Sequence, residues 1–162
     1  MSKTIKVATW NVGQDLRNNE INEDSYKYIK EQIEQNGVDI IAFQEAITES
    51  NNLESLANYI SQNTKLKYNE QISLSPSDMN ENDKMGVAVC SKFKISNNEN
   101  YILENPNLIY KKTETITYWS HDKGFNISEI KELNTIVIGG HCLPFHIFGE
   151  TPLNYKKIYE KL

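Results

Sequence analysis

Two stretches of the sequence decide the fold: VATWNVG at residues 7–13 and VDIIAFQEA at residues 38–46. Each is an apolar, strand-like run that ends near a polar residue able to bind a hard cation, Asn11 in the first and Glu45 in the second. A segment with helical periodicity separates them, so together they predict one β-α-β unit. Parallel strands joined by a crossover helix place their carboxyl ends at one edge of the sheet, where ligands of open α/β sheets bind. We therefore expect Asn11 and Glu45 to lie close together.

The segment between the two strands has the features of an amphipathic helix. Asn22 suits the N-cap, and Gly37 suits the position just after the last turn. The apolar positions recur at helical spacing, at Tyr26, Ile29 and Ile33. A second amphipathic helix is predicted over residues 52–62, where Leu53, Leu56, Ala57 and Ile60 repeat in the same way.

The middle of the chain reads as a loop followed by strands. Residues 73–84 are polar and contain Pro76, which predicts a loop. Strand-like segments then follow without intervening helices, at residues 86–91, 94–103, 113–119, 125–130 and 135–139. Such a run favours antiparallel strands added to the same sheet. Thr151 as N-cap with Pro152 after it predicts a last helix that reaches Leu162.

Length and composition favour an ordinary globular protein. The 162 residues fit one domain over residues 1–162, and the formal net charge is −5 with Arg17 as the sole arginine. No basic face is apparent, which argues against a bulk binder of duplex nucleic acid. No apolar run is long enough to span a bilayer, and we expect a soluble, cytoplasmic chain. Cys90 and Cys142 are interpreted as small buried residues.

Four motifs in order carry a resemblance to a known family. The sequence has the strand that ends on Asn11, Phe-Gln-Glu at residues 43–45, MGVAVCSK at residues 85–92 and IVIGGH at residues 136–141. Together they resemble the amino-terminal half of the endonuclease/exonuclease/phosphatase superfamily, whose fold is similar to that of deoxyribonuclease I. The resemblance implies an α/β fold: the amino-terminal half of a four-layered α/β sandwich, with a mixed β-sheet and helices on one face.

The resemblance also implies roles for particular residues. Asn11 and Glu45 would be ligands of Mg²⁺ or Mn²⁺, His141 would act at the phosphate, and Lys123 is a candidate contact for the substrate. These residue types suit the chemistry, because Mg²⁺ prefers oxygen donors and phosphoryl transfer depends mostly on positioning and charge neutralisation. The implied substrate is a phosphoester, either nucleic acid or a smaller phosphorylated molecule.

Structural interpretations of the same residues stay open. Asn11 suits a turn, Glu45 suits a solvated surface, His141 suits a hydrogen-bonded structural histidine, and Lys123 in Asp-Lys-Gly suits a turn better than a phosphate contact. The two tryptophans, Trp10 and Trp119, are expected in the core.

The sequence departs from the family pattern in one respect. The Gly-Asp-x-Asn motif and the Asp-His pair of the family's carboxyl-terminal half are not in this chain. One hypothesis is therefore the amino-terminal portion of a magnesium-dependent phosphoesterase, weakly active or inactive alone. The other is a non-catalytic chain that acts through association with a second copy or with a complementary carboxyl-terminal half. Association is expected because one half alone would leave an apolar sheet face uncovered.

Overall fold

The two decisive stretches form adjacent parallel strands. The computed structural model describes residues 4–13, 23–77 and 80–160. Strand β1 (Val7–Asn11) pairs in parallel with β2 (Ile40–Glu49), and α2 (Glu23–Asn36) lies between them in sequence. Within α2 the predicted stripe of Tyr26, Ile29 and Ile33 is at most 1% exposed, and Gly37 has the expected positive φ of 62°. The predicted β-α-β unit is confirmed, although Asn22 lies outside the described residues.

The first sheet has the strand order β1-β2-β4-β3 and carries its helices on one face. Its other elements are α3 (Leu56–Asn63), β3 (Tyr68–Pro76) and β4 (Lys84–Ser91). The two helices pack on the sheet through the largest apolar cluster, which includes Phe43, Ile41 and Ala88 from the strands. Helix α3 begins four residues later than predicted, because the Ser55 side chain caps it by accepting a hydrogen bond from the Asn58 amide.

The predicted loop over residues 73–84 is wrong in its first part. Strand β3 extends to Pro76 and pairs with β4 on the side away from β2. The sequence pattern did not reveal this strand, because only two of its nine residues, Ile72 and Ser75, are buried. Edge strands of this kind lack the apolar run that identifies a central strand.

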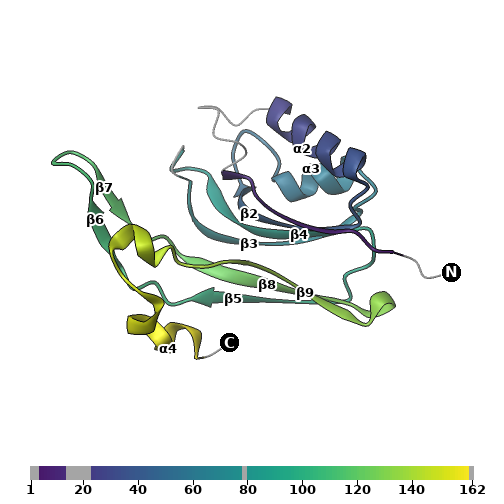
Figure 1. Ribbon diagram of the computed structural model, residues 1–162. Helices are drawn as coiled ribbons and strands as arrows, with labels where there is room; N and C mark the ends of the chain where they lie inside the picture. The colour runs from purple at the N-terminus through teal and green to yellow at the C-terminus, as the bar shows by residue number, and fades with distance from the viewer. Residues whose placement is uncertain (1–3, 14–22, 78–79, 161–162) are drawn as a thin grey trace.

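The later strands do not join the first sheet, which corrects the prediction of one enlarged sheet. They form a second sheet of order β5-β8-β9 and a separate hairpin, β6-β7. Their bounds are β5 (Asn97–Leu103), β6 (Ile109–Lys111), β7 (Thr117–Trp119), β8 (Lys123–Ile130) and β9 (Thr135–His141). Figure 1 shows the second sheet lying across the face of the first that the helices leave open.

The two sheets meet closely at a glycine. An apolar cluster of Ile40, Ala42, Val89, Phe93 and Ile130 fills the space between them. At Gly139 in β9, a Cβ atom would lie 2.9 Å from Val89 Cγ2 and 3.2 Å from Ala42 Cβ. At the next residue, Gly140, a Cβ would overlap the ring of Phe125 on the opposite face of the second sheet. Both faces of β9 therefore exclude a side chain immediately before His141.

The last described segment packs against the outer face of the second sheet. Thr151 caps a 3₁₀ turn, η3 (Pro152–Tyr155), by accepting a hydrogen bond from the Leu153 amide, and α4 (Lys156–Tyr159) follows. The predicted cap is confirmed, but the α-helical part is one turn long. A cluster including Leu103, Phe145 and Ile158 docks this segment.

The apolar surface that remains exposed is not the one expected from the sequence, which was a face of the first sheet. The second sheet covers β2, β4 and β3 of the first sheet, while Ile136 and Ile138 on its own outer face remain 63% and 61% exposed. Two other expectations about burial are wrong: Trp119 is 60% exposed, and Cys142 is exposed whereas Cys90 is buried. Trp10, by contrast, packs against the main core.

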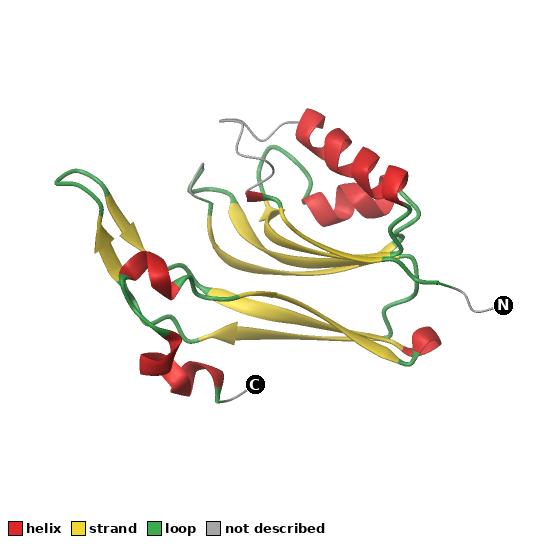
Figure 2. Ribbon diagram, viewed as in Figure 1, coloured by secondary structure: helices red, strands yellow, loops and turns green. Residues whose placement is uncertain are grey.

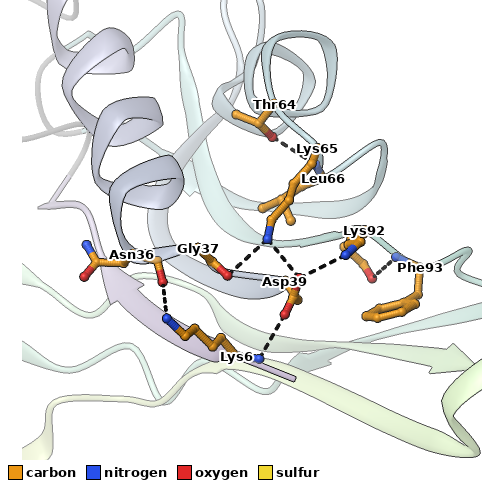
Figure 3. A network of polar contacts seen from close by, with 10 residues as sticks. Lys6, Asn36, Gly37, Asp39, Thr64, Lys65, Leu66, Lys92 and Phe93 are labelled. Carbon is orange, nitrogen blue, oxygen red and sulfur yellow. Dashed lines mark hydrogen bonds and ion pairs between the residues drawn. The ribbon is translucent and has the colours of Figure 1, made fainter. Parts of the chain in front are cut away.

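A network around Asp39 fastens the amino ends of the first strands (Figure 3). The Asp39 carboxylate accepts a hydrogen bond from the Lys6 amide at 3.1 Å and forms ion pairs with Lys65 at 2.9 Å and Lys92 at 3.5 Å. These partners come from the start of β1, the segment after α3 and the segment after β4. The Lys65 hydrogen bond and the Lys6 amide hold the pKa of Asp39 at about 2, below its usual value.

Candidate functional site

Glu45 sits on a bulge in the middle of β2. The pairing with β4 shifts between Gln44 and Ala46, so the residue between them has no direct partner. Glu45 accordingly has a φ of 54°, a left-handed conformation that is costly for a residue with a side chain. Bulges of this kind redirect a side chain and are frequent beside active sites. Strand β4 holds the strained residue in place, because it pairs with β2 on both sides of the bulge.

A glycine on the neighbouring strand accompanies the bulge. Gly86 in β4 pairs with Ala46, directly after the bulged residue. A Cβ atom at Gly86 would overlap the backbone carbonyl of Ile72 in β3. Since a backbone carbonyl cannot turn aside as a flexible side chain can, this position requires glycine.

The predicted proximity of Asn11 and Glu45 is confirmed. The Asn11 Nδ2 group donates a hydrogen bond to Glu45 Oε1 at 3.2 Å, and the Gly13 amide donates to Asn11 Oδ1 at 2.9 Å. The register explains the contact, since Asn11 lies beside Gln44 at the carboxyl end of β1. Their role as metal ligands remains a prediction.

His141, the last residue of β9, brings the second sheet to the same place. Its Nε2 atom lies 3.6 Å from Glu45 Oε1, and both side chains are less than one fifth exposed. On its other side, Nδ1 lies 3.2 Å from Lys123 Nζ. Burial, followed by the positive charge of Lys123, lowers the pKa of His141 to about 4. The imidazole is therefore neutral near pH 7.

The position of Lys123 favours one tautomer of this histidine. An ammonium group can only donate, so Nδ1 of the neutral ring accepts and Nε2 carries the proton. That N–H is on the side of the ring that faces Glu45. The interpretation of Lys123 as a turn residue is wrong: it begins β8 and is 6% exposed.

Two of the four side chains, Asn11 and Glu45, can supply oxygen ligands, but the group does not form a closed metal site. Within residues 4–13, 23–77 and 80–160, no three His, Cys, Asp or Glu side chains gather as a metal centre would require. Asn11 and Glu45 offer one amide oxygen and one carboxylate. This donor set suits Mg²⁺, which commonly retains several waters and takes one or two carboxylates together with substrate phosphate.

A cavity of about 420 Å³ opens beside Glu45 and Lys123. The hairpin β6-β7 forms one wall, and a 3₁₀ turn, η2 (Phe145–Phe148), contributes to another. Four aromatic residues line the cavity: Tyr110, Tyr118, Trp119 and Phe148. The sequence interpretation did not identify any of them as site residues, and it placed Trp119 in the core. His121 lines the cavity as well.

A larger cavity, of about 710 Å³, lies elsewhere. It runs along the open side of β1 beneath α2, and its lining includes Trp10 and Tyr28 but no acidic side chain. Neither Glu45 nor His141 lines this larger cavity.

In the described part of the chain no helix is both long enough and apolar enough to cross a membrane.

Comparisons with known proteins agree with this architecture. An endonuclease/exonuclease/phosphatase family protein from Leptotrichia buccalis C-1013-b has a TM-score of 0.62 at 17% identity, over 98% of this chain and 63% of that chain. The endonuclease/exonuclease/phosphatase from Beutenbergia cavernae DSM 12333 has a TM-score of 0.58 at 14% identity, over 85% of this chain and 38% of that one. These likenesses establish the fold, and the chain spans less than two thirds of the length of either structure.

The sequence itself supplies the family assignment. The comparison with curated proteins gave no match. The model of the Endonuclease/Exonuclease/phosphatase family, however, matches residues 8–138. That range contains most of β1, all of β2 with the bulge at Glu45, and most of β9. The motifs quoted above and the observed fold lead to the same assignment: this chain belongs to the Endonuclease/Exonuclease/phosphatase family.

Proposed function

We propose that this chain provides the amino-terminal part of a divalent-metal-dependent phosphoesterase. The observation that supports the proposal best is the convergence of Asn11, Glu45 and His141 from β1, β2 and β9. Two strands of one sheet and one strand of another bring a carboxylate, an amide and a neutral imidazole to one place. Family membership makes phosphoester chemistry the expected use of such a group.

In this proposal Asn11 and Glu45 would hold Mg²⁺ or Mn²⁺. In this structure the NH₂ group of Asn11 donates a hydrogen bond to the Glu45 carboxylate. The carboxylate therefore attracts a partially positive group at the place proposed for the ion. When bound, a divalent ion polarises a phosphoryl oxygen and stabilises the leaving oxygen. The bulge contributes by holding Glu45 where an ordinary strand residue would not point.

His141 acts as a hydrogen-bond donor to the phosphate. Lys123 engages Nδ1, so the proton on Nε2 is directed into the site. The ring is neutral near pH 7, which suits a donor that stabilises charge by position. Lys123 serves as a positioning residue, and its buried charge adds to the attraction of the site for an anion.

Weak hydrolysis is expected from the chain by itself. The sequence has neither the Gly-Asp-x-Asn motif nor the Asp-His pair that the resemblance associates with activation of water. The expected activity therefore lies near background, while ion binding at Glu45 is retained.

Titration calorimetry with Mg²⁺ and Mn²⁺ tests the proposal. In Glu45→Gln the affinity for either ion should fall at least tenfold, because the carboxylate is the charged ligand, while the melting temperature stays nearly unchanged. Glu49→Gln is the matched control: Glu49 ends the same strand but is paired with Lys84 at 2.8 Å, so ion binding should persist. Equal ion binding by wild type and Glu45→Gln would refute the proposed metal site.

A second candidate is a non-catalytic chain that acts through association. The exposed Val7 on β1, at 65%, and the exposed Ile136 and Ile138 on the second sheet favour it, since each offers apolar surface that a partner could cover. Sedimentation velocity separates the candidates. A concentration-dependent dimer that binds no divalent ion would favour association as the function.

A further inference from the structure

We propose that the cavity beside Glu45 binds the ring of a small phosphorylated molecule, with its phosphate at the Glu45–His141 site. The inference rests on the proposed function for the phosphate, and it adds the chemical class of the rest of the ligand. Its structural basis is a pair of aromatic rings on the hairpin β6-β7, which Figure 1 shows extending beyond the end of the second sheet.

The hairpin presents two tyrosine rings to the cavity. Tyr110 and Tyr118 are directly paired across β6 and β7, so their side chains lie on the same face. Their ring centroids are 6.3 Å apart with an angle of 12° between the planes, and the residues are 39% and 43% exposed. Exposed aromatic faces held nearly parallel by a short hairpin suit contact with another flat ring.

Apolar residues from a different part of the chain also line the cavity. They are Ile147 and Phe148 of η2, with Pro144 just before it. Ligand pockets of this type are mostly apolar with a few convergent polar groups, and the volume of about 420 Å³ is within their usual range. A single phosphorylated monomer fits this space, whereas a nucleic acid duplex does not.

The charged residues of the cavity favour an anion. Lys112 and Lys123 are the basic lining residues, and Glu45 is the acidic lining residue within the described chain. This local balance is opposite to the formal net charge of −5 for the whole protein. Lys123 lies beside His141, with 3.2 Å between its Nζ and Nδ1 of the ring, so a ligand with its phosphate at this end would place its ring toward the tyrosines that line the same cavity.

Nucleotides and sugar phosphates share this chemistry, and binding measurements distinguish them. Calorimetric titrations in Mg²⁺ buffer compare adenosine 5′-monophosphate, glucose 6-phosphate and inorganic phosphate, with ³¹P spectra to verify that each ester remains intact. At least one ester should bind about tenfold or more tightly than inorganic phosphate, because stacking on an aromatic side chain contributes about 1–3 kcal/mol, and 1.4 kcal/mol is tenfold. The preferred ester identifies the source of the ring.

The variant Tyr118→Ala should abolish the preference for the ester while leaving the affinity for inorganic phosphate within about twofold. Ile109→Ala is the matched control, since Ile109 is paired with Trp119 on the same hairpin, is 60% exposed and does not line the cavity. Circular dichroism verifies folding, and Tyr110→Ala replaces Tyr118→Ala if the latter unfolds. Equal affinity for phosphate and both esters in wild type, or an unchanged preference in the tyrosine variant, would overturn the proposal.

Adenosine and glucose without phosphate separate this inference from the proposed function. If one of them binds in a Tyr118-dependent manner while Mg²⁺ and phosphate do not bind, the cavity binds rings and the phosphoesterase proposal fails. If Mg²⁺ and phosphate bind in a Glu45-dependent manner but no ring compound gains affinity over phosphate, the phosphoesterase proposal stands and the cavity proposal fails.

Discussion

The two ends of the first sheet carry polar clusters that are built in opposite ways. At the amino end of β2, Asp39 has cationic lysines and a backbone amide as partners, and its pKa is held at about 2. Glu45 lies beside the carboxyl end of β1. It has left-handed backbone geometry and contacts the side-chain amide of Asn11 and a neutral His141. The first carboxylate is neutralised by the protein; the second is held in a strained position beside a cavity.

This difference separates a structural cluster from a candidate site within a single sheet. A carboxylate that is already paired with cations gains little from a metal ion and stabilises the fold instead. A carboxylate on a bulge costs stability, and proteins retain such strain mainly where function requires it. The geometry of each cluster, more than the residue type, distinguishes their roles.

The largest expected effect on stability is at Gly86, next to the bulge at Glu45. Gly86→Ala should lower the free energy of unfolding by about 3 kcal/mol or more, because its Cβ would overlap the Ile72 carbonyl beside the bulge. Urea unfolding measures this. Gly149→Ala is the control, since Gly149 has a φ of 69° but no atom within 4 Å of an added Cβ, and it should cost about 1–2 kcal/mol. Similar losses in the two variants would contradict the close approach at Gly86.

Asp39→Asn should lower the free energy of unfolding by about 1–2 kcal/mol at pH 7, after allowance for the exposed lysine ends. The folded pKa of about 2 lies below the ordinary 3.8, so the carboxylate stabilises the fold above about pH 4 and loses this effect as the pH falls through 2. Thermal unfolding from pH 7 to pH 2 should show wild type and variant converging at the acid end. A constant difference across that range would show that the charge of Asp39 is not the cause.

The smallest effects are expected among the lysines of the Asp39 cluster. Lys65→Met should lower the free energy of unfolding by about 0.5–1 kcal/mol, and Lys92→Met should lower it less. Lys65 lies 2.9 Å from the Asp39 carboxylate and also donates a hydrogen bond to the Gly37 carbonyl. Lys92 lies 3.5 Å from the same carboxylate. Carboxyl NMR titration of Asp39 should show its pKa rising more in Lys65→Met. The reverse order would indicate that Lys92 is the main partner.

The sequence predicted the first β-α-β unit well because several independent signals coincide there. Val38 to Phe43 are all at most 9% exposed, and the buried stripe of α2 follows strict helical spacing. These signals fix two strand ends, which is why the contact of Asn11 with Glu45 could be anticipated. The bulge that aims Glu45 could not, because it depends on the register between β2 and β4.

The second sheet was less predictable for a physical reason. Alternating residues identify a strand and its faces, but they do not specify the sheet to which it belongs. The segments at residues 125–130 and 135–139 were assigned as strands correctly, yet the sheet they form packs on the first instead of extending it. Lys123 was misread for a related reason, because Asp-Lys-Gly resembles a turn when its distant partner, His141, is not known.

Gly139 and Gly140 of β9 restrict sequence change immediately before His141. A side chain at residue 139 would press on Val89 in the first sheet, and one at residue 140 would press on Phe125 in the second. A slip of β9 by a single residue would turn His141 to the opposite face of its sheet. Substitution is thus more restricted at these two positions, which have no functional group, than at the exposed hairpin. Substitutions on that hairpin leave the position of the imidazole unchanged.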